Sequence, residues 1–344
     1  IGHGGKHRGQ VLLGVLHAHR FLIGHLPCTE LTQSLFPRPG DIGWTPADWA
    51  WIGGLMDMAM PCLYYGVPLV SHRFAKFDPD AAFALLVEEG VSNAFIPPTG
   101  LRLMRGARLP QGVRLRAVSS GGEPLGGDLL DWGRETLRAD LGELYGQTEA
   151  NLLVASSVIG MERHPGAMGL PVPGHDVAVL EAEGNEAGTG EVGEVCLRMP
   201  DPVAFLCYWN KPEATAEKVR DGWLRTGDLA TRRSDGHLVF HARDDDVITS
   251  AGYRIGPSEI EAALLRHPDV VMAAVVGEPD PIRTETVVAH VVLRDGADGA
   301  GIEAALKDLV RTRVSAHLVP RKVVLADSLP MTATGKIMRR ALRK

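Results

Sequence analysis

The segment GELYGQTEAN, residues 142–151, brings an aromatic ring, a hydroxyl and a carboxylate close together in the sequence. Tyr145 offers an aromatic face on which a purine can stack. Thr148 offers a hydroxyl to a phosphate, and Glu149 offers a hard carboxylate oxygen to Mg²⁺. We expect a short strand over residues 143–145 and then a loop that enters a helix, where Thr148 could equally cap the helix and Glu149 face its dipole.

Two other segments place polar groups at the ends of expected strands. SSGGEP, residues 119–124, follows an apolar run that begins at Leu115. Open α/β sheets bind ligands beyond the carboxyl ends of their strands, and glycine there lets a flat ring lie against the backbone. In RTGDLA, residues 225–230, Asp228 can accept two hydrogen bonds from a cis-diol. Taken alone, each segment is also compatible with a plain turn.

A charged run followed by small residues lies at residues 243–261, RDDDVITSAGYRIGPSEIE. Three adjacent carboxylates, Asp244–Asp246, repel one another and belong at a solvated edge or beside cations. Ser250-Ala251-Gly252 allows a close approach to the backbone. Ser258 is the expected N-cap of the helix that follows. On its pattern alone, the segment is a turn between a strand and a helix.

Four segments, in chain order, resemble the signature segments of the adenylate-forming superfamily, which includes the acyl-CoA synthetases. They are GELYGQTEAN at 142–151, GWLRTGDLA at 222–230, RDDDVITSAGYRIGPSEIE at 243–261 and TATGKIMRR at 332–340. GVLHAHR at 14–20 resembles the segment just after the family's phosphate-binding loop, but residues 2–13 keep only glycines of that loop. The resemblance covers Gly14 to Lys344, so we expect the loop and the large N-terminal portion of a complete enzyme to be absent here.

The resemblance implies roles for particular residues. Lys336 matches the catalytic lysine, acting with Thr148 and Glu149, and Glu149 is the implied Mg²⁺ ligand. Asp245 matches the hinge about which the small domain turns. The implied ATP- or AMP-binding residues are Gly121, Gly122, Glu123, Pro124, Tyr145, Gly146, Gln147, Thr148, Asp228, Arg243 and Arg254, and the implied CoA-binding residues are Ser250, Ala251, Gly252 and Arg311. By charge pattern alone, Lys336 would be a solvated lysine in a basic tail.

The activity implied by the resemblance is that of an AMP-forming acyl-CoA synthetase, closest to the acetyl- and medium-chain types. A carboxylate does not react with a thiol at neutral pH, whereas an acyl-adenylate made from ATP carries AMP as a leaving group. ATP, Mg²⁺ and CoA are therefore expected, together with a small-molecule carboxylic acid that the sequence does not specify. Two alternatives stay open: a module that loads a carrier protein, and a catalytically silent relative that only binds AMP or CoA.

The coarse pattern predicts an α/β fold in two domains. Short apolar runs alternate with helices, as over residues 79–90 and 91–104, which indicates a layered domain with parallel strands. A small β-rich part with a hairpin is expected over 174–240. We place the boundary so that 1–242 is the C-terminal part of the large AMP-binding domain and 243–344 is a small, mobile α+β domain. In the small domain we expect strands at 269–280, 286–293 and 322–330 and a helix at 302–314.

Composition narrows the class of protein further. A formal charge of −6 gives no general attraction to nucleic acid or to an anionic membrane. Residues 49–70 are long enough to span a bilayer but contain Asp57, two prolines and three glycines. We expect a helix to begin near Thr45. We expect residues 49–70 to form a core helix followed by a buried strand. The four cysteines form no CxxC pair, so reduced thiols in the cytoplasm are expected: Cys28, Cys62, Cys196 and Cys207.

Overall fold

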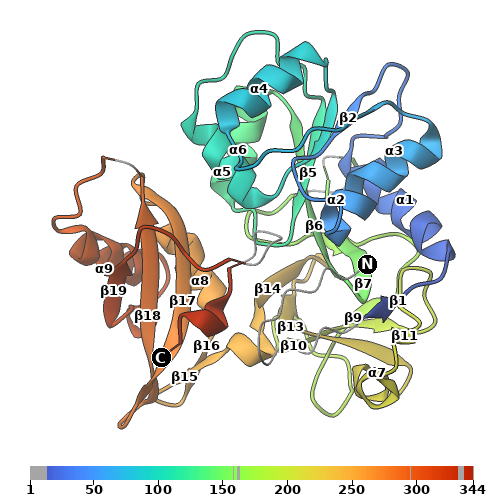
Figure 1. Cartoon of the computed structure of the whole chain (residues 1–344). Coiled ribbons are helices and arrows are strands. Elements are labelled where there is room, and N and C mark those ends of the chain that lie inside the picture. The colour runs from blue at the N-terminus through green and yellow to red at the C-terminus, as the bar shows by residue number, and fades with distance from the viewer. Residues whose placement is uncertain (1–13, 158, 161–162, 295, 332–336, 344) are drawn as a thin grey trace. The chain divides into compact units, whose positions relative to one another are not determined.

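The computed structural model describes residues 14–157, 159–160, 163–294, 296–331 and 337–343. The chain divides into two compact units, one made of residues 1–226 and 231–239 and the other of residues 227–230 and 240–344 (Figure 1). The boundary between residues 242 and 243 stays a prediction. Within the described ranges, no helix has both the length and the apolar character that crossing a membrane requires.

The first unit is built on a seven-stranded sheet with strand order β3-β2-β4-β5-β6-β7-β8. Strands β3 to β6 run parallel, and β7 and β8 are each antiparallel to the preceding strand. Helices α4, α5 and α6 lie along one face, and α1 and α3 along the other (Figure 1). The elements are α1 (Arg20–Thr32), β2 (Gly43–Trp44), α2 (Ile52–Gly54), the π-helix η1 (Leu55–Ala59), α3 (Met60–Tyr65), β3 (Leu69–Val70), α4 (Pro79–Glu88), β4 (Asn93–Phe95), α5 (Pro98–Gly106), β5 (Ala117–Gly121), α6 (Gly127–Trp132), the π-helix η2 (Gly133–Leu137), β6 (Asp140–Gln147), β7 (Ala150–Ser156) and β8 (Leu170–Pro171).

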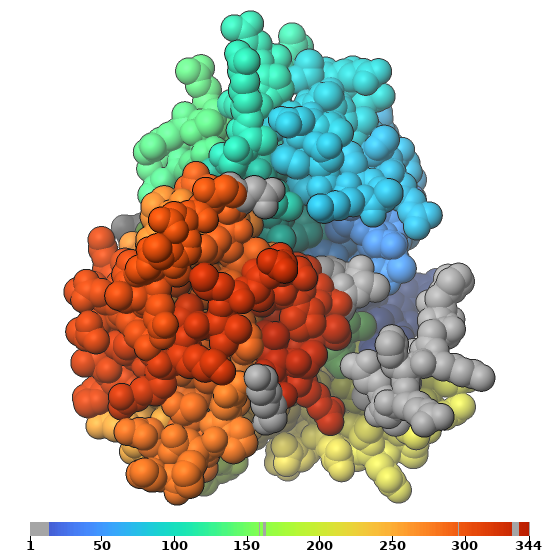
Figure 2. Space-filling view, turned by 60° about the vertical axis from the view of Figure 1, so that its left-hand side comes forward, coloured from blue at the N-terminus to red at the C-terminus, as the bar shows by residue number. Residues whose placement is uncertain are grey.

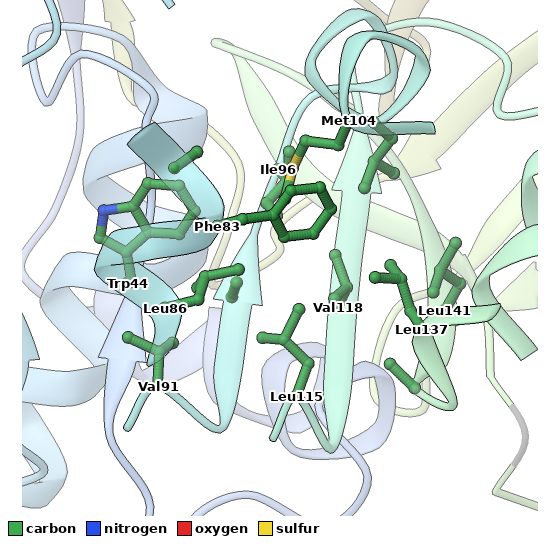
Figure 3. Close-up of a cluster of buried hydrophobic side chains, with 14 of the residues drawn as sticks. Trp44, Phe83, Leu86, Val91, Ile96, Met104, Leu115, Val118, Leu137 and Leu141 are labelled. Carbon is green, nitrogen blue, oxygen red and sulfur yellow. The ribbon is translucent and has the colours of Figure 1, made fainter. Parts of the chain in front are cut away.

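Strand β6 contributes to a core on each face of this sheet because successive side chains of a strand point to opposite sides. Leu141 packs in one core with Phe83 of α4 and Met104 of α5 (Figure 3). Leu144, three residues further on, packs in the other core with Cys28 of α1. The centre of the sheet is thus covered on both sides, as expected for parallel strands that read as continuous apolar runs.

The predicted helix start near Thr45 is wrong. The hydroxyl of Thr45 accepts a hydrogen bond of 3.1 Å from the backbone N–H of Ala47, which closes a local turn. Helix α2 begins at Ile52, with Trp51 as its N-cap. Helix α2, η1 and α3 then continue to residue 65, so the core helix predicted within 49–70 is present, and the strand after it, β3, is half-buried.

The predicted helix after Gln147 is also wrong. Strand β6 turns back at Thr148 and Glu149 into β7, whose seven residues are all buried. Helix α1 packs on this strand. Burial on both faces favours a strand in a stretch whose sequence also permits a helix. Thr148 therefore does not cap a helix, and Glu149 does not face a helix dipole.

The predicted β-rich part of the first unit is a five-stranded sheet with order β12-β13-β10-β9, in which β14 pairs with β13. Its predicted hairpin is confirmed, because β9 and β10 pair antiparallel with Glu194 opposite Leu180. A separate two-stranded ladder joins β1 and β11. The elements are β1 (Val15–Leu16), β9 (Val177–Leu180), β10 (Val192–Arg198), β11 (Cys207–Tyr208), α7 (Pro212–Lys218), β12 (Val219–Arg220), β13 (Trp223–Arg232) and β14 (Leu238–Arg243).

The second unit has a sheet with order β16-β15-β18-β17, in which β19 lies parallel beside β18. Helices α8 and α9 pack on it through Leu264 and Leu306. Its C-terminal residues (red) lie at the surface in Figure 2. The predicted cap at Ser258 is wrong, since Gly256 is the N-cap of α8 and Pro257 the first helical residue. The elements are η3 (Asp244–Asp246), β15 (Ile248–Ser250), β16 (Tyr253–Ile255), α8 (Pro257–Leu264), β17 (Val270–Asp280), β18 (Thr284–Leu293), α9 (Ile302–Arg313), η4 (Ala316–Leu318), β19 (Lys322–Leu325) and η5 (Arg339–Ala341).

The predicted fold class, a layered α/β part with a β-rich addition followed by a small α+β part, is confirmed by these two units. The strands and the helix predicted for the last hundred residues match β17, β18, β19 and α9.

Candidate active site

The carboxyl ends of β5 and β6 lie side by side, since the two strands are parallel and Gly121 is registered with Leu144. A Cβ on Gly121 would lie 2.6 Å from the carbonyl oxygen of Leu144, so only glycine fits there. Gly122 has a φ of +95°, which glycine adopts without strain. The predicted segments 119–124 and 145–149 therefore meet at one edge of the sheet, which we call the nucleotide edge.

The polar residues after β5 are held by a neighbouring helix. Glu123 accepts a hydrogen bond of 3.1 Å from Arg102 of α5 and one of 3.3 Å from the hydroxyl of Thr99. A second nitrogen of Arg102 donates to the carbonyl oxygen of Pro124 at 3.2 Å. These bonds hold the chain at Glu123 and Pro124 against α5.

Gly146 lies in an irregularity of the β6–β7 ladder, between the pairs Tyr145–Val154 and Gln147–Ala150. A Cβ at Gly146 would lie 2.4 Å from the backbone nitrogen of Leu152. Leu152 itself has a φ of +58°. Bulges of this kind are frequent beside active sites, where they redirect neighbouring side chains.

The turn after this bulge carries the predicted phosphate and magnesium residues. Thr148 is exposed, and its carbonyl oxygen accepts a hydrogen bond of 2.7 Å from His17. Glu149 is half-buried, and one carboxylate oxygen accepts a hydrogen bond of 2.5 Å from the Tyr208 hydroxyl. The backbone N–H of Phe205 donates to the Glu149 carbonyl at 2.7 Å. The turn thus holds a hydroxyl in solvent and a carboxylate in a fixed position.

A buried carboxylate, Glu143, lies in β6 just before these residues. Burial raises the pKa of Glu143 to about 7, although the backbone N–H of Leu125 donates to it at 3.2 Å and the nearby charge of Arg163 opposes the rise. Sequence reasoning did not select Glu143, because nothing in its spacing separates it from the other residues of the strand.

Gln147 contacts β13, the strand that contains Asp228. The side-chain amide of Gln147 donates to the carbonyl oxygen of Thr226 in β13 at 3.1 Å. Asp228 follows two residues later in β13 and is 7% exposed. Within the second unit, a guanidinium nitrogen of Arg243 lies 3.9 Å from the Asp228 carboxylate. These two residues, both predicted to bind ATP or AMP, are therefore neighbours.

The acidic run lies beside cations, as the sequence predicts. Arg254 pairs with Asp244 at 3.0 Å, and both side chains are exposed. The other two carboxylates are likewise paired, Asp245 with Arg243 at 2.9 Å and Asp246 with Arg343 at 2.8 Å. Each of the three adjacent acids thus has an arginine of its own, which offsets their mutual repulsion.

A cavity of about 390 Å³ in the second unit contains three of the four predicted CoA-binding residues, Ser250, Ala251 and Arg311. Gly252 follows directly in the turn between β15 and β16 with a φ of +85°. The rings of Tyr253 and His317 stack at its rim with centroids 5.1 Å apart. The other residues that line the cavity are Arg283, Val287, Lys307, Ala316, Val319, Pro320 and Arg321.

Sequence reasoning missed most of the cations of this basic cavity. Lys307 and Arg311 are four residues apart on α9, so helical spacing could have paired them. Arg283 and Arg321 lie in separate loops, and only the folded chain brings them together. Lys336, the predicted catalytic lysine, lies outside the described residues.

Comparisons with known proteins identify the family to which this chain is similar. The family model of the AMP-binding enzyme matches residues 14–209, and that of the AMP-binding enzyme C-terminal domain matches residues 259–336. The mitochondrial acyl-coenzyme A synthetase ACSM4 of Rattus norvegicus is 37% identical over 93% of this chain and 56% of its own length. The acetyl-coenzyme A synthetase of Bacillus subtilis is 31% identical over 96% of this chain and 58% of its own length.

Solved structures of similar fold were also found. The amide bond synthetase McbA from Marinactinospora thermotolerans has a TM-score of 0.84 at 31% identity, covering 96% of this chain and 67% of that one. A benzoate CoA ligase from Burkholderia xenovorans has a TM-score of 0.86 at 29% identity, with 96% and 67% covered. The chain spans a little over half the length of the curated relatives it matches. The chain belongs to the adenylate-forming family of AMP-binding enzymes.

Proposed function

We propose that this chain carries the nucleotide edge and the CoA-binding unit of an AMP-forming acyl-CoA synthetase, which activates a carboxylic acid with ATP and transfers the acyl group to CoA. The observation that carries the proposal is the basic cavity, where Arg311 meets the adjacent Ser250 and Ala251 although it lies about sixty residues further along the chain. Relatives named as acyl-coenzyme A and acetyl-coenzyme A synthetases support the same reading.

The charge of the cavity favours CoA over a carrier protein as the thiol acceptor. Arg283, Lys307, Arg311 and Arg321 line one space. CoA carries a diphosphate and a further phosphate on its ribose, whereas the pantetheine arm of a carrier protein has a single phosphodiester. Four cations around one cavity match the more highly charged of these two molecules.

The first chemical step needs positive charge where negative groups meet. The substrate carboxylate attacks the α-phosphate of ATP, and the bond between that phosphate and the leaving pyrophosphate breaks. We assign Lys336 to the reacting oxygens; at ~4 Å and an effective dielectric near ~20 its charge is worth ~4 kcal/mol before reorganisation. Tyr145 stacks on the adenine, and Thr148 donates its hydroxyl to a phosphate.

Three further residues complete this assignment. Asp228 accepts the ribose hydroxyls, with Arg243 beside it. Glu149 would hold Mg²⁺, because a hard carboxylate oxygen held at a turn fits an ion that takes one or two carboxylates together with phosphate oxygens. When bound, that ion neutralises phosphate charge. Arg254 contacts a phosphate once it leaves its exposed pairing with Asp244.

In the second step the thiol of CoA attacks the acyl carbonyl carbon, and AMP leaves with the electrons of the broken acyl–phosphate bond. Ser250, Ala251 and Gly252 line the path of the pantetheine arm. A Cβ on Gly252 would meet nothing within 4 Å, so the turn has space beside it. Asp245 acts as the hinge that exchanges Lys336 for this turn between the two steps.

The test separates the two half-reactions. We expect the chain to exchange pyrophosphate into ATP in the presence of an acid, and Lys336→Ala to abolish that exchange while thioester formation from supplied acyl-adenylate is retained. Arg340→Ala, which removes an exposed cation of the same segment, is the matched control and should change neither rate. A chain that binds AMP but exchanges no pyrophosphate would be the silent relative, and equal loss of both half-reactions in Lys336→Ala would contradict the hinge.

A further inference from the structure

Two tight turns that lie far apart in the sequence meet beside the first unit's β-rich sheet. The first closes with a hydrogen bond of 3.0 Å from the N–H of Ala167 to the carbonyl of His164. The second connects β13 to β14, where the N–H of Gly236 donates to the carbonyl of Arg233 at 3.0 Å. Leu238 joins the two turned segments, since its N–H and its carbonyl bond to the backbone of residues 168–169 at 2.8 Å each.

These turns bring two imidazoles to one carboxylate. His164 Nε2 lies 3.0 Å from Asp235 Oδ2, and His237 Nδ1 lies 3.2 Å from Asp235 Oδ1. The two rings are nearly perpendicular, with centroids 4.5 Å apart. One ligand atom from each residue lies within 4.8 Å of the other two. A metal ion with bonds of about 2.0–2.2 Å to nitrogen and oxygen fits among such atoms after a small contraction.

Burial and charge favour a cation at this cluster. His237 is 3% exposed, and His164 is half-buried. The backbone N–H of His237 donates a hydrogen bond of 3.1 Å to Asp235 Oδ1, which holds the carboxylate beside both rings. Arg233 Nε lies 3.1 Å from Asp235 Oδ2 and 3.3 Å from Oδ1, and its side chain is exposed enough to move aside.

We propose that His164, Asp235 and His237 form a binding site for one divalent transition-metal ion of the zinc type, which fastens the 164–169 segment to the turn between β13 and β14. Two imidazoles and one carboxylate are a donor set that zinc and its neighbours take up, whereas Mg²⁺ and Ca²⁺ prefer oxygen alone. The fourth position faces solvent on the exposed side of Asp235 and takes water. The site is separate from the nucleotide edge and does not depend on the proposed function.

Binding replaces hydrogen bonds with metal–ligand bonds in a simple exchange. Each histidine binds through the nitrogen that now faces Asp235, so the proton on that nitrogen moves to the other ring nitrogen or to solvent. Apart from this N–H bond, no covalent bond of the chain is made or broken, and no electron is transferred. The preformed backbone turns mean that little ordering of the chain is needed.

The experiment uses the full chain without a histidine tag, stripped of metal by a chelator. Titration with Co²⁺ is followed by the visible absorption of the bound ion, and titration with Zn²⁺ by calorimetry. We expect one equivalent to bind and to raise the unfolding temperature. His164→Gln and Asp235→Asn should each weaken binding at least about tenfold, since loss even of a supporting partner costs that much.

His267→Ala is the matched control. His267 lies 4.0 Å from Asp269, a histidine–carboxylate pair for which the described residues offer no third ligand, and its loss should leave the titrations unchanged. Arg233→Gln should bind at least as tightly as the unaltered chain, because a competing cation is removed. Absence of stoichiometric binding, or binding that persists in folded His164→Gln and Asp235→Asn, would overturn the proposal and leave a hydrogen-bonded cluster only.

Discussion

The nucleotide edge and the basic cavity are built in opposite ways. At the edge, glycines bring backbone against backbone, and a Cβ on Gly121 or Gly146 would lie 2.6 or 2.4 Å from a main-chain atom. In the cavity, long cationic side chains reach into open space, and each of Arg283 and Arg311 has an acid neighbour on its own segment. Under the proposed function, the first region recognises a shape, and the second recognises charge.

This difference predicts how each region responds to change. A backbone-built site fails when any atom is added, because protein interiors are close-packed and cannot absorb the volume locally. A site built from solvated side chains loses its contacts one at a time, and each contact is screened by salt. Substitutions should therefore act sharply at the nucleotide edge and gradually in the cavity.

The largest effect is expected for Gly146→Ala. Its Cβ would lie 2.4 Å from the nitrogen of Leu152, so β6 or β7 must shift. We expect a loss of about 3 kcal/mol in the free energy of unfolding and no measurable binding of AMP. Gly106→Ala at the end of α5, where a Cβ meets nothing within 4 Å, is the control and should be neutral or stabilising by up to about 1 kcal/mol. Equal stability of the two variants would contradict the steric account.

The next largest effect concerns the buried carboxylate of the same strand. Because the pKa of Glu143 rises from 4.5 to about 7 on folding, the folded state holds its proton more tightly. Its stabilising contribution is complete below pH 4.5 and is lost as the pH rises through 7. As the pH rises from about 4.5 to about 8.5, the free energy of unfolding of Glu143→Gln should therefore increase by on the order of 2–3 kcal/mol relative to that of the unaltered chain. Urea unfolding at each pH measures this difference.

The control for this measurement is Glu88→Gln, an exposed glutamate at the end of α4, which is measured over the same pH range. A difference for Glu143→Gln that stayed constant with pH would show that burial does not govern this carboxyl. The sensitivity of the nucleotide edge to substitution would then rest on steric packing alone.

A moderate effect is expected for Arg311→Ala in the cavity. One charged hydrogen bond to a phosphate is worth about 1.5 kcal/mol, so the KM for CoA should rise about tenfold. The rise should shrink at high salt, and pyrophosphate exchange should be unaffected. Arg313→Ala, on the same helix but outside the cavity lining, is the control. A rise in KM of the same size for Arg313→Ala would mean that net charge, and not the cavity, attracts CoA.

The smallest effect is expected for Lys307→Met. Its ammonium already contacts the carbonyl of Arg321 at 2.7 Å and the carboxylate of Glu303 at 2.8 Å. Because these internal partners occupy it, the KM for CoA should change by less than about threefold. The hydrogen bond from Lys307 also lowers the pKa of Glu303, and NMR titration of Lys307→Met should find that pKa raised again. A rise in the KM for CoA as large as that expected for Arg311→Ala would mean that the two cations contribute equally.

Local signals in the sequence were sufficient for much of the fold. Helix α4 begins where its sequence indicates, since Asp78 accepts hydrogen bonds from the N–H groups of Asp80 and Ala81 and proline occupies the first position. The long apolar runs of β17 and β18 have no competing helical pattern. At the nucleotide edge, the segments after β5 and β6 were both selected because strand ends carry function in parallel sheets.

The failures occur where distant contacts decide. The stretch Ala150–Leu153 permits a helix by composition, but the sheet and α1 bury it on both sides. Ser258 loses its capping position because Pro257 already suits the first turn of α8. The cluster of His164 with Asp235 and His237 has no sequence signal at all, since its parts are about seventy residues apart and only the pairing of two turns unites them.

Strand β13 has a practical consequence for anyone who wishes to recombine modules of such enzymes. Residues 227–230 belong to the second unit, while the residues on either side of them in the same strand belong to the first. Cleavage of one peptide bond therefore cannot separate the two units intact. A fragment that starts at residue 240 should lack four residues of the second unit, 227–230. Chimaeras that also take residues 227–230 from the donor should therefore express and fold better than chimaeras that do not.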